Sequence, residues 1–102
     1  MNLDDLRKAT FVPDRGGLLT RAGRALQKHG ERTVTAFPKP KGNEAALNKT
    51  AQDIVDDILT HPSSKIVTRT QGRYGEVIDI IAPDRRGLRF DKNGNFIGFL
   101  EP

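Results

Sequence analysis

The pattern of apolar residues changes at Pro62, and this change constrains the fold more than any other feature. Before Pro62, apolar residues recur at helical spacing, whereas after it they form short runs separated by Gly, Pro, Asp and Asn. A period near 3.6 indicates a helix, and short apolar runs between turn residues indicate strands. Helices followed by a run of strands favour an α+β fold.

Two helices are predicted before Pro62. The first has Thr20 as its N-cap and ends at Gly30, and the second has Asn43 as its N-cap and ends at Pro62. The predicted buried stripes are Leu19, Ala22, Leu26 and His29 in the first helix and Leu47, Ala51, Ile54, Val55 and Ile58 in the second.

Four antiparallel strands are predicted after Pro62, at about 65–70, 76–82, 87–91 and 95–100. The Asn93-Gly94 pair is the strongest turn signal, because both residue types tolerate the positive φ of a tight hairpin. The predicted fold class is therefore α+β, with two N-terminal helices packed on a four-stranded antiparallel sheet, and the core takes in Phe90, Phe96 and Phe99.

The length of 102 residues fits one domain, because so few apolar side chains cannot build two cores. Residues 1–17 look like a flexible linker, since Pro13, Gly16 and Gly17 break any periodicity. Residues 18–102 are expected to form the single folded domain.

The formal charge of +4 attracts polyanions, although charge alone does not separate nucleic acid from an acidic surface. The chain has no cysteine, which excludes disulfides, thiolate metal sites and cysteine nucleophiles. No apolar run is long enough to span a membrane, and residues 1–10 do not resemble a signal peptide. We expect no membrane partner.

Motifs of other enzyme classes are missing from the sequence: there is no Walker loop, dinucleotide glycine fingerprint, zinc pattern or serine-hydrolase elbow. Asp53, Asp56 and Asp57 share one helix and could in principle collect Mg²⁺. A solvated acidic helix face is the favoured interpretation, because no histidine or further carboxylate cluster accompanies them. We therefore expect neither a metal nor an organic cofactor.

Several separated motifs resemble the C-terminal toxin domain of contact-dependent inhibition proteins, Rhs proteins and related bacterial polymorphic toxins. They are Leu19–Gly30, Phe37-Pro38-Lys39, Gly42-Asn43, Asp56–Thr60, Arg86–Phe90 and Asn93–Pro102. The resemblance implies a ribonuclease similar to the barnase, EndoU, colicin and RelE group, whose members often attack transfer RNA. It also implies export as the tip of a larger secreted toxin, action in the cytoplasm of the target cell, and a cognate acidic immunity protein.

The sequence departs from the family pattern before the Arg73-Tyr74-Gly75 turn. Relatives often carry histidines there, whereas this chain has Thr70 and Gln71. If those histidines are catalytic in relatives, this chain is either weakened or uses other groups. Thr70 is therefore kept among the candidate catalytic residues.

RNA cleavage without a metal needs a base, an acid and cations around the phosphorane. Histidine suits proton transfer near neutral pH. His29 is the candidate because cationic residues surround it in the sequence, although a histidine at the end of a helix can simply complement the helix dipole. His61, before Pro62, is expected to be an exposed turn residue.

Arg73 and Arg89 are candidates for transition-state stabilisation, since guanidinium groups on a rigid sheet can hold a phosphate through two hydrogen bonds. An ordinary solvated strand residue is the alternative for each. The candidate substrate-binding residues are Arg21, Arg24, Lys28, Lys39, Lys41, Arg69 and Tyr74. Tyr74 could stack on a base or cap the edge of the core.

The leading hypothesis is a metal-independent endoribonuclease toxin, monomeric when free, that cleaves tRNA to a 2′,3′-cyclic phosphate. Two alternatives stay open, since the basic charge supports both: a non-catalytic RNA- or DNA-binding module, and an inhibitor that occupies the ribosome.

Overall fold

A computed structural model describes residues 2–102 of the chain. Three helices precede four strands, and a short 3₁₀ turn at Asp14–Gly16 separates the first helix from the second. The elements are α1 (Leu3–Phe11), α2 (Arg21–Gly30), α3 (Glu44–Thr60), β1 (Lys65–Gln71), β2 (Gly75–Ile81), β3 (Gly87–Asp91) and β4 (Phe96–Leu100). The predicted caps are confirmed, because the side chains of Thr20 and Asn43 accept backbone hydrogen bonds from the first turns of α2 and α3.

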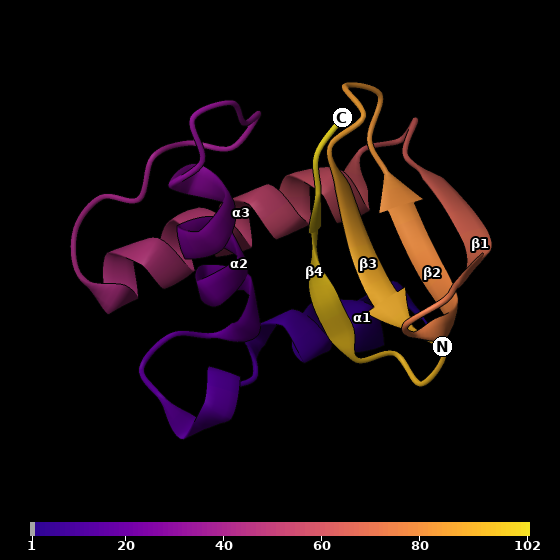
Figure 1. The fold of residues 1–102 in the computed structure, drawn as a ribbon, viewed down its shortest axis with the longest axis horizontal. Helices are drawn as coiled ribbons and strands as arrows, with labels where there is room; N and C mark the ends of the chain where they lie inside the picture. Colours follow the sequence, from indigo (N-terminus) through magenta and orange to yellow (C-terminus); the bar gives the residue numbers. More distant parts are fainter. Residues whose placement is uncertain (1) are drawn as a thin grey trace.

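The four strands form one antiparallel sheet in the order β1-β2-β3-β4, in which each strand pairs with its neighbour in the chain. The helices gather on one side: α3 passes behind the sheet, and α2 lies beside the edge strand β4 (Figure 1). The predicted α+β fold is confirmed.

The core lies between the helices and one face of the sheet. The predicted stripe of α3 is buried, and so are the three phenylalanines of the β3–β4 hairpin. Ile80 and Leu88 point toward the helices, so Asp79 and Arg89, one position away along β2 and β3, point to the opposite face. We call this helix-free side the open face.

The β3–β4 turn is built by Asp91 and Gly94. The Asp91 carboxylate accepts from the backbone N–H groups of Asn93 and Asn95 at 2.9 Å, and Gly94 has a φ of +86°. In the Asn-Gly pair, Gly94 has a positive φ and Asn93 does not. A two-residue type I′ hairpin turn would need a positive φ at both residues, so this turn is of another type.

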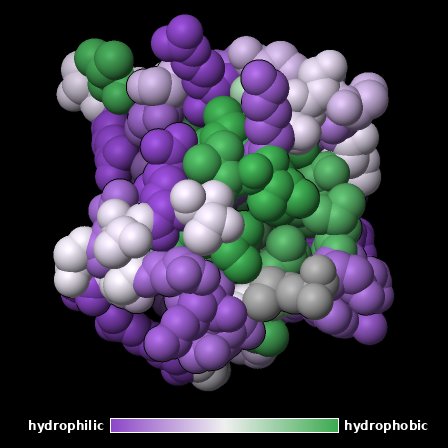
Figure 2. Space-filling view, turned by 90° about the vertical axis from the view of Figure 1, so that its right-hand side faces the viewer, coloured by the Kyte–Doolittle hydropathy of each residue, from purple (hydrophilic) through white to green (hydrophobic). Residues whose placement is uncertain are grey.

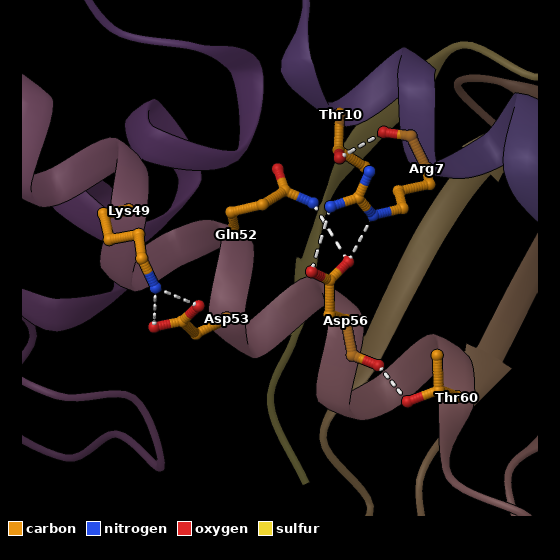
Figure 3. Close-up of polar contacts among 7 residues, drawn as sticks. All are labelled: Arg7, Thr10, Lys49, Gln52, Asp53, Asp56 and Thr60. Atoms are coloured by element: carbon orange, nitrogen blue, oxygen red, sulfur yellow. Dashed lines mark hydrogen bonds and ion pairs between the residues drawn. The ribbon is translucent and has the colours of Figure 1, made fainter.

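The structure departs from the expected flexible linker, because α1 is an ordered helix packed on α3. Leu6 is buried in the core, and Arg7 forms a two-pronged ion pair with Asp56, with Nε 2.6 Å from Oδ1 (Figure 3). The hydrogen bond from Arg7 holds the pKa of Asp56 below its ordinary value. The apolar residues of this segment show no regular spacing, so the sequence did not indicate the core contact of Leu6 or the ion pair between Arg7 and Asp56.

The side of the molecule at β1 is the least covered by helices. Figure 2 shows hydrophobic side chains gathered on this side between hydrophilic ones, and β1 carries Ile66, which is 64% exposed. In residues 2–102, no helix is long and apolar enough to cross a bilayer.

Candidate functional site

A groove of about 900 Å³ runs between α2 and β4 and reaches Arg89 of β3 and Tyr74 of the β1–β2 turn. Its lining is Asp14, Arg15, Arg21, Arg24, Ala25, Lys28, His29, Arg32, Tyr74, Arg89 and residues 96–101. One side of the groove is therefore formed by the cations of α2, and the other side by the sheet at its β4 edge. We call it the basic groove.

The helix side of the basic groove carries Arg21, Arg24, Lys28 and, just past the helix end, Arg32. Residues three or four apart share one face of a helix, so these cations form a row. Arg24 pairs with Asp14 at 3.2 Å, whereas Arg21 and Lys28 make no ion pair within residues 2–102. The row is therefore left with positive charge that can attract a polyanion.

A close contact with α3 fixes the position of this row. Asn48 accepts a hydrogen bond of 2.9 Å from the backbone N–H of Thr20 and donates one to the carbonyl of Leu18. A Cβ atom at Gly23 would collide with the Asn48 amide oxygen, so glycine allows the two helices this approach. The start of α2, and with it Arg21 and Arg24, is thereby held on α3.

His29 sits in the wall of the basic groove and is 7% exposed. Its ring packs edge-on against Phe37 and Phe99, and Nδ1 lies 2.8 Å from Oε2 of Glu101. Arg32 also approaches Nδ1, at 3.1 Å. Since a guanidinium only donates hydrogen bonds, a proton on Nδ1 is directed to Glu101, and Arg32 acts through its ion pair with that carboxylate.

Glu101 is held as an anion by several donors. Burial alone would raise its pKa, but hydrogen bonds from the Thr35 hydroxyl, the Ala36 amide and His29 lower that pKa to about 2. The Thr35 hydroxyl lies at 2.6 Å and the Ala36 amide at 2.9 Å. The carboxylate therefore ties the loop after α2 to the imidazole.

The strand β3 contributes Arg89 to the basic groove, and the β1–β2 turn contributes Tyr74. Arg89 forms two hydrogen bonds of 2.8 Å with Asp79, which is 1% exposed. These bonds raise the pKa of Arg89 further above its ordinary value. Arg73 stacks its guanidinium over the Tyr74 ring, 5.4 Å from the centroid, at the rim of the groove.

The structure brings together six of the candidate site residues in the lining of the basic groove: Arg21, Arg24, Lys28, His29, Tyr74 and Arg89. Arg73 contacts Tyr74 at the rim, and Arg69 lies beyond it, 3.1 Å from Asp79.

Besides Arg69 and Arg73, three further candidates lie outside the groove lining found in residues 2–102. Lys39 donates to the carbonyl of Arg32 at 2.8 Å, and Lys41 is exposed in the loop before α3. Thr70 is exposed on β1 and, by strand alternation, faces away from Arg69 and the open face. The structure thus separates Thr70 from His29, and the prediction that groups them in one site is not supported by their positions.

The acidic residues of α3 do not converge. Asp53 pairs with Lys49, Asp56 with Arg7 and Asp57 with Arg86. In residues 2–102, no group of three or more His, Cys, Asp or Glu side chains is placed to hold a metal ion. Each aspartate is therefore paired with a different cation on the surface of the helix, in line with the interpretation favoured from the sequence.

Four groups near the site are missing from the sequence-based candidates: Arg15, Arg32, Asp79 and Glu101. Asp79 did carry a signal, since it is the one charged residue in the apolar run Val77–Ile81. Glu101 had no local signal, because its contacts to His29 and Thr35 cross most of the chain.

An α+β domain with a basic groove and one imidazole in its wall defines a class of small proteins equipped to hold and process a polyanion. The family model of the CdiA C-terminal tRNase toxin domain matches residues 9–101. The chain therefore belongs to this family and is a tRNA-cleaving toxin domain, which confirms the predicted family and enzyme class.

A solved structure gives the same fold. The chain is similar to the toxic C-terminal tip of CdiA from Pseudomonas aeruginosa, crystallised with its immune protein. The two are 25% identical, the alignment covers 92% of this chain and 99% of the other, and the TM-score is 0.77. A search of curated proteins found no match.

Proposed function

We propose that the chain cleaves tRNA in the basic groove by attack of a ribose 2′-hydroxyl on the adjacent phosphate, leaving a 2′,3′-cyclic phosphate and a 5′-hydroxyl. The observation that carries this proposal is the placement of His29 in the wall of a groove lined by α2 cations and by Arg89. In this reaction the RNA supplies the nucleophile, so the protein needs only proton transfer and charge stabilisation.

His29 is the proton-transfer group in this proposal. Because Glu101 occupies Nδ1, the Nε2 atom is the nitrogen left to take the 2′-hydroxyl proton or to protonate the leaving 5′-oxygen. Glu101 orients the ring and stabilises the imidazolium that forms, as a carboxylate behind a histidine does in other enzymes. The aromatic contacts with Phe37 and Phe99 restrict the ring further.

The cations divide between binding and catalysis. Arg21, Lys28 and the neighbouring α2 cations bind phosphates along the strand, since such contacts position RNA without reading its sequence. Arg89 is fixed by two hydrogen bonds to Asp79 and stabilises the additional negative charge of the phosphorane. Tyr74, which is half-exposed beside Arg73, stacks on an unpaired base.

The test uses the purified chain and total tRNA in EDTA, with mapping of the RNA ends. Discrete fragments with 2′,3′-cyclic phosphate and 5′-hydroxyl ends are expected. Fragments with 3′-hydroxyl ends, or cleavage that requires added Mg²⁺, would overturn the metal-independent mechanism. RNA that is bound but intact in both conditions would instead indicate a binding module.

We further propose that the chain is carried at the C-terminal end of a larger CdiA-type protein, acts in the cytoplasm of the target cell, and is neutralised by an acidic immunity protein. The CdiA tip of P. aeruginosa was crystallised with its immune protein, and the basic groove offers a complementary charge for such a partner. Binding that weakens as salt is raised supports a partner seated on this groove, and binding that ignores salt argues against it.

A further inference from the structure

Three strands of the sheet bring two arginines to one buried carboxylate on the open face. Asp79 of β2 lies directly opposite Arg89 of β3, and each of its oxygens accepts a hydrogen bond of 2.8 Å from that guanidinium. Arg69 of β1 lies on the diagonal, with Nε 3.1 Å from Oδ2. Both arginines are thereby paired with the same carboxylate.

The charges in this cluster do not cancel. Two guanidinium groups face one carboxylate, and Asp79 is 1% exposed, so water screens it poorly. Each guanidinium has five N–H donors, of which Arg89 uses two on Asp79 and Arg69 directs one toward it. Within residues 2–102, neither side chain makes another hydrogen bond, so most of their donors are left for a ligand.

The exposed fractions indicate where these donors point. The Arg69 side chain is 51% exposed and that of Arg89 is 18% exposed, whereas the carboxylate between them is shielded. A buried ion pair that only stabilised the sheet would need one arginine, and the second adds a positive charge at the surface. A ligand that meets this pair must be anionic and have several acceptor oxygens.

Two neighbouring features limit the class of ligand that would fit these arginines. Arg89 and Tyr74 line the basic groove, so the two arginines extend this groove from α2 across β4 toward β1. Asp91 of β3, an acidic residue on the same face, is turned into the β3–β4 turn, where it accepts three hydrogen bonds from Asn93 and Asn95. The open face therefore continues a cationic path beside an aromatic ring.

We propose that Arg69 and Arg89, held by Asp79, form a phosphate clamp on the open face, in which Arg89 contacts the scissile phosphate and Arg69 binds the neighbouring phosphate of a single-stranded RNA. The clamp rests on the proposed function, since it places RNA across both α2 and the sheet. In this arrangement Asp79 is a positioning residue: it touches no RNA and aims both guanidinium groups.

The test measures equilibrium binding of a short 2′-O-methylated single-stranded RNA in EDTA across a series of salt concentrations. This probe has no free 2′-hydroxyl, so transphosphorylation cannot cleave it and binding is read separately from catalysis. Arg69→Gln is expected to weaken binding about fivefold to tenfold and to reduce the salt dependence by roughly one phosphate contact. Arg69→Lys should restore the salt dependence but only part of the affinity, because lysine lacks the planar fork.

Arg85→Gln is the matched control, since Arg85 is an exposed arginine in the β2–β3 turn and outside the groove lining. Asp79→Asn gives the sharper result: it makes the protein more positive, yet binding should weaken because the two arginines lose their common anchor. Tighter binding by a folded Asp79→Asn protein, or equal effects of Arg69→Gln and Arg85→Gln, would overturn the clamp.

The two proposals can fail separately in this design. Cleavage of the 2′-O-methylated RNA would contradict attack by the 2′-hydroxyl while the binding data still decide on the clamp. Should Asp79→Asn fail to fold by circular dichroism, the Arg69 variants and the Arg85 control still decide the outcome.

Discussion

Glu101 Oε2 lies 2.8 Å from His29 Nδ1, although 72 positions separate the two residues in the chain. The contact joins the end of α2 to the residue that follows β4, and the basic groove passes between these elements. Because the carboxylate occupies Nδ1, Nε2 is the imidazole nitrogen left for proton transfer. Proton transfer in the groove therefore depends on the pairing of His29 with Glu101.

Replacing His29 should separate binding from cleavage. His29→Gln is expected to lower kcat by about 10²- to 10⁴-fold with a small change in KM, because the ring transfers protons and does not hold phosphate. The measurement is steady-state cleavage of tRNA in EDTA over a range of tRNA concentrations. His61→Gln is the control, since this exposed histidine only accepts the Ser63 amide through Nδ1. Equal losses in both variants would show that His29 has no special role.

The low pKa of Glu101 predicts how stability depends on pH. The pKa falls from an ordinary value of 4.5 to about 2 in the folded protein, so the carboxylate stabilises the protein above pH 4.5, and this contribution disappears as pH falls through 2. Glu101→Gln should therefore cost on the order of 1–2 kcal/mol at pH 6, after allowance for solvent screening, and much less at pH 2.

Urea unfolding at several pH values measures this difference. Glu31→Gln is the control for removing one negative charge, because Glu31 is exposed at the end of α2. If the difference in unfolding free energy between wild type and Glu101→Gln stays constant from pH 6 to pH 2, the ionised Glu101 carboxylate is not the source of this stability.

Arg21 and Lys28, the α2 cations that form no ion pair with the residues the structure describes, should account for much of the salt dependence of RNA binding. Removing both, in Arg21→Gln with Lys28→Gln, is expected to reduce the slope of log K against log salt by about 1.4, at roughly 0.7 for each phosphate contact with a single strand. The double variant Lys8→Gln with Lys49→Gln removes the same charge from exposed intrahelical ion pairs. Identical slopes for the two double variants would place the RNA elsewhere.

The ordered position of α1 can be tested with two leucines of the same helix. Leu6→Ala should lower the free energy of unfolding by about 2–4 kcal/mol, because Leu6 is buried in the core. Leu3→Ala should change it by less than about 0.5 kcal/mol, since Leu3 is exposed. If both substitutions change the free energy of unfolding by the same small amount, residues 1–17 behave as a linker and α1 does not contribute to the core.

The close contact of α2 with α3 predicts that Gly23 tolerates no side chain. Gly23→Ala should destabilise the protein by about 1–3 kcal/mol, because its methyl group would displace Asn48 from the backbone of Thr20. Gly72→Ala is the control, since a Cβ there meets nothing within 4 Å. A neutral effect of Gly23→Ala would mean that the helices can separate at no cost.

The fold was predictable because its signals are local. Thr20, Asn43 and Pro62 mark helix ends through contacts within a few residues, and Asp91 with Gly94 shapes a hairpin in the same way. The helix α1 was missed although Asn2 caps it and two aspartates follow in its first turn, because its apolar residues show no clear stripe.

The candidate site was only partly predictable, for the same reason. Arg21, Arg24 and Lys28 share a helix face, which spacing alone indicates. Glu101 reaches His29 only after the whole chain has folded, so no window of sequence shows the pair. Asp79 stood out as a charge in an apolar strand, but its two arginine partners depend on the register of β1 and β3.

The sheet that carries Asp79 also carries Ile80 one position later, pointing the other way. A single layer of backbone thus divides the sheet residues that hold the helices from the sheet residues proposed to meet RNA. Substitutions on the outer side can accumulate while the inner side keeps its packing, so a lineage of such chains could acquire new RNA preferences and new immunity partners without having to evolve a new fold.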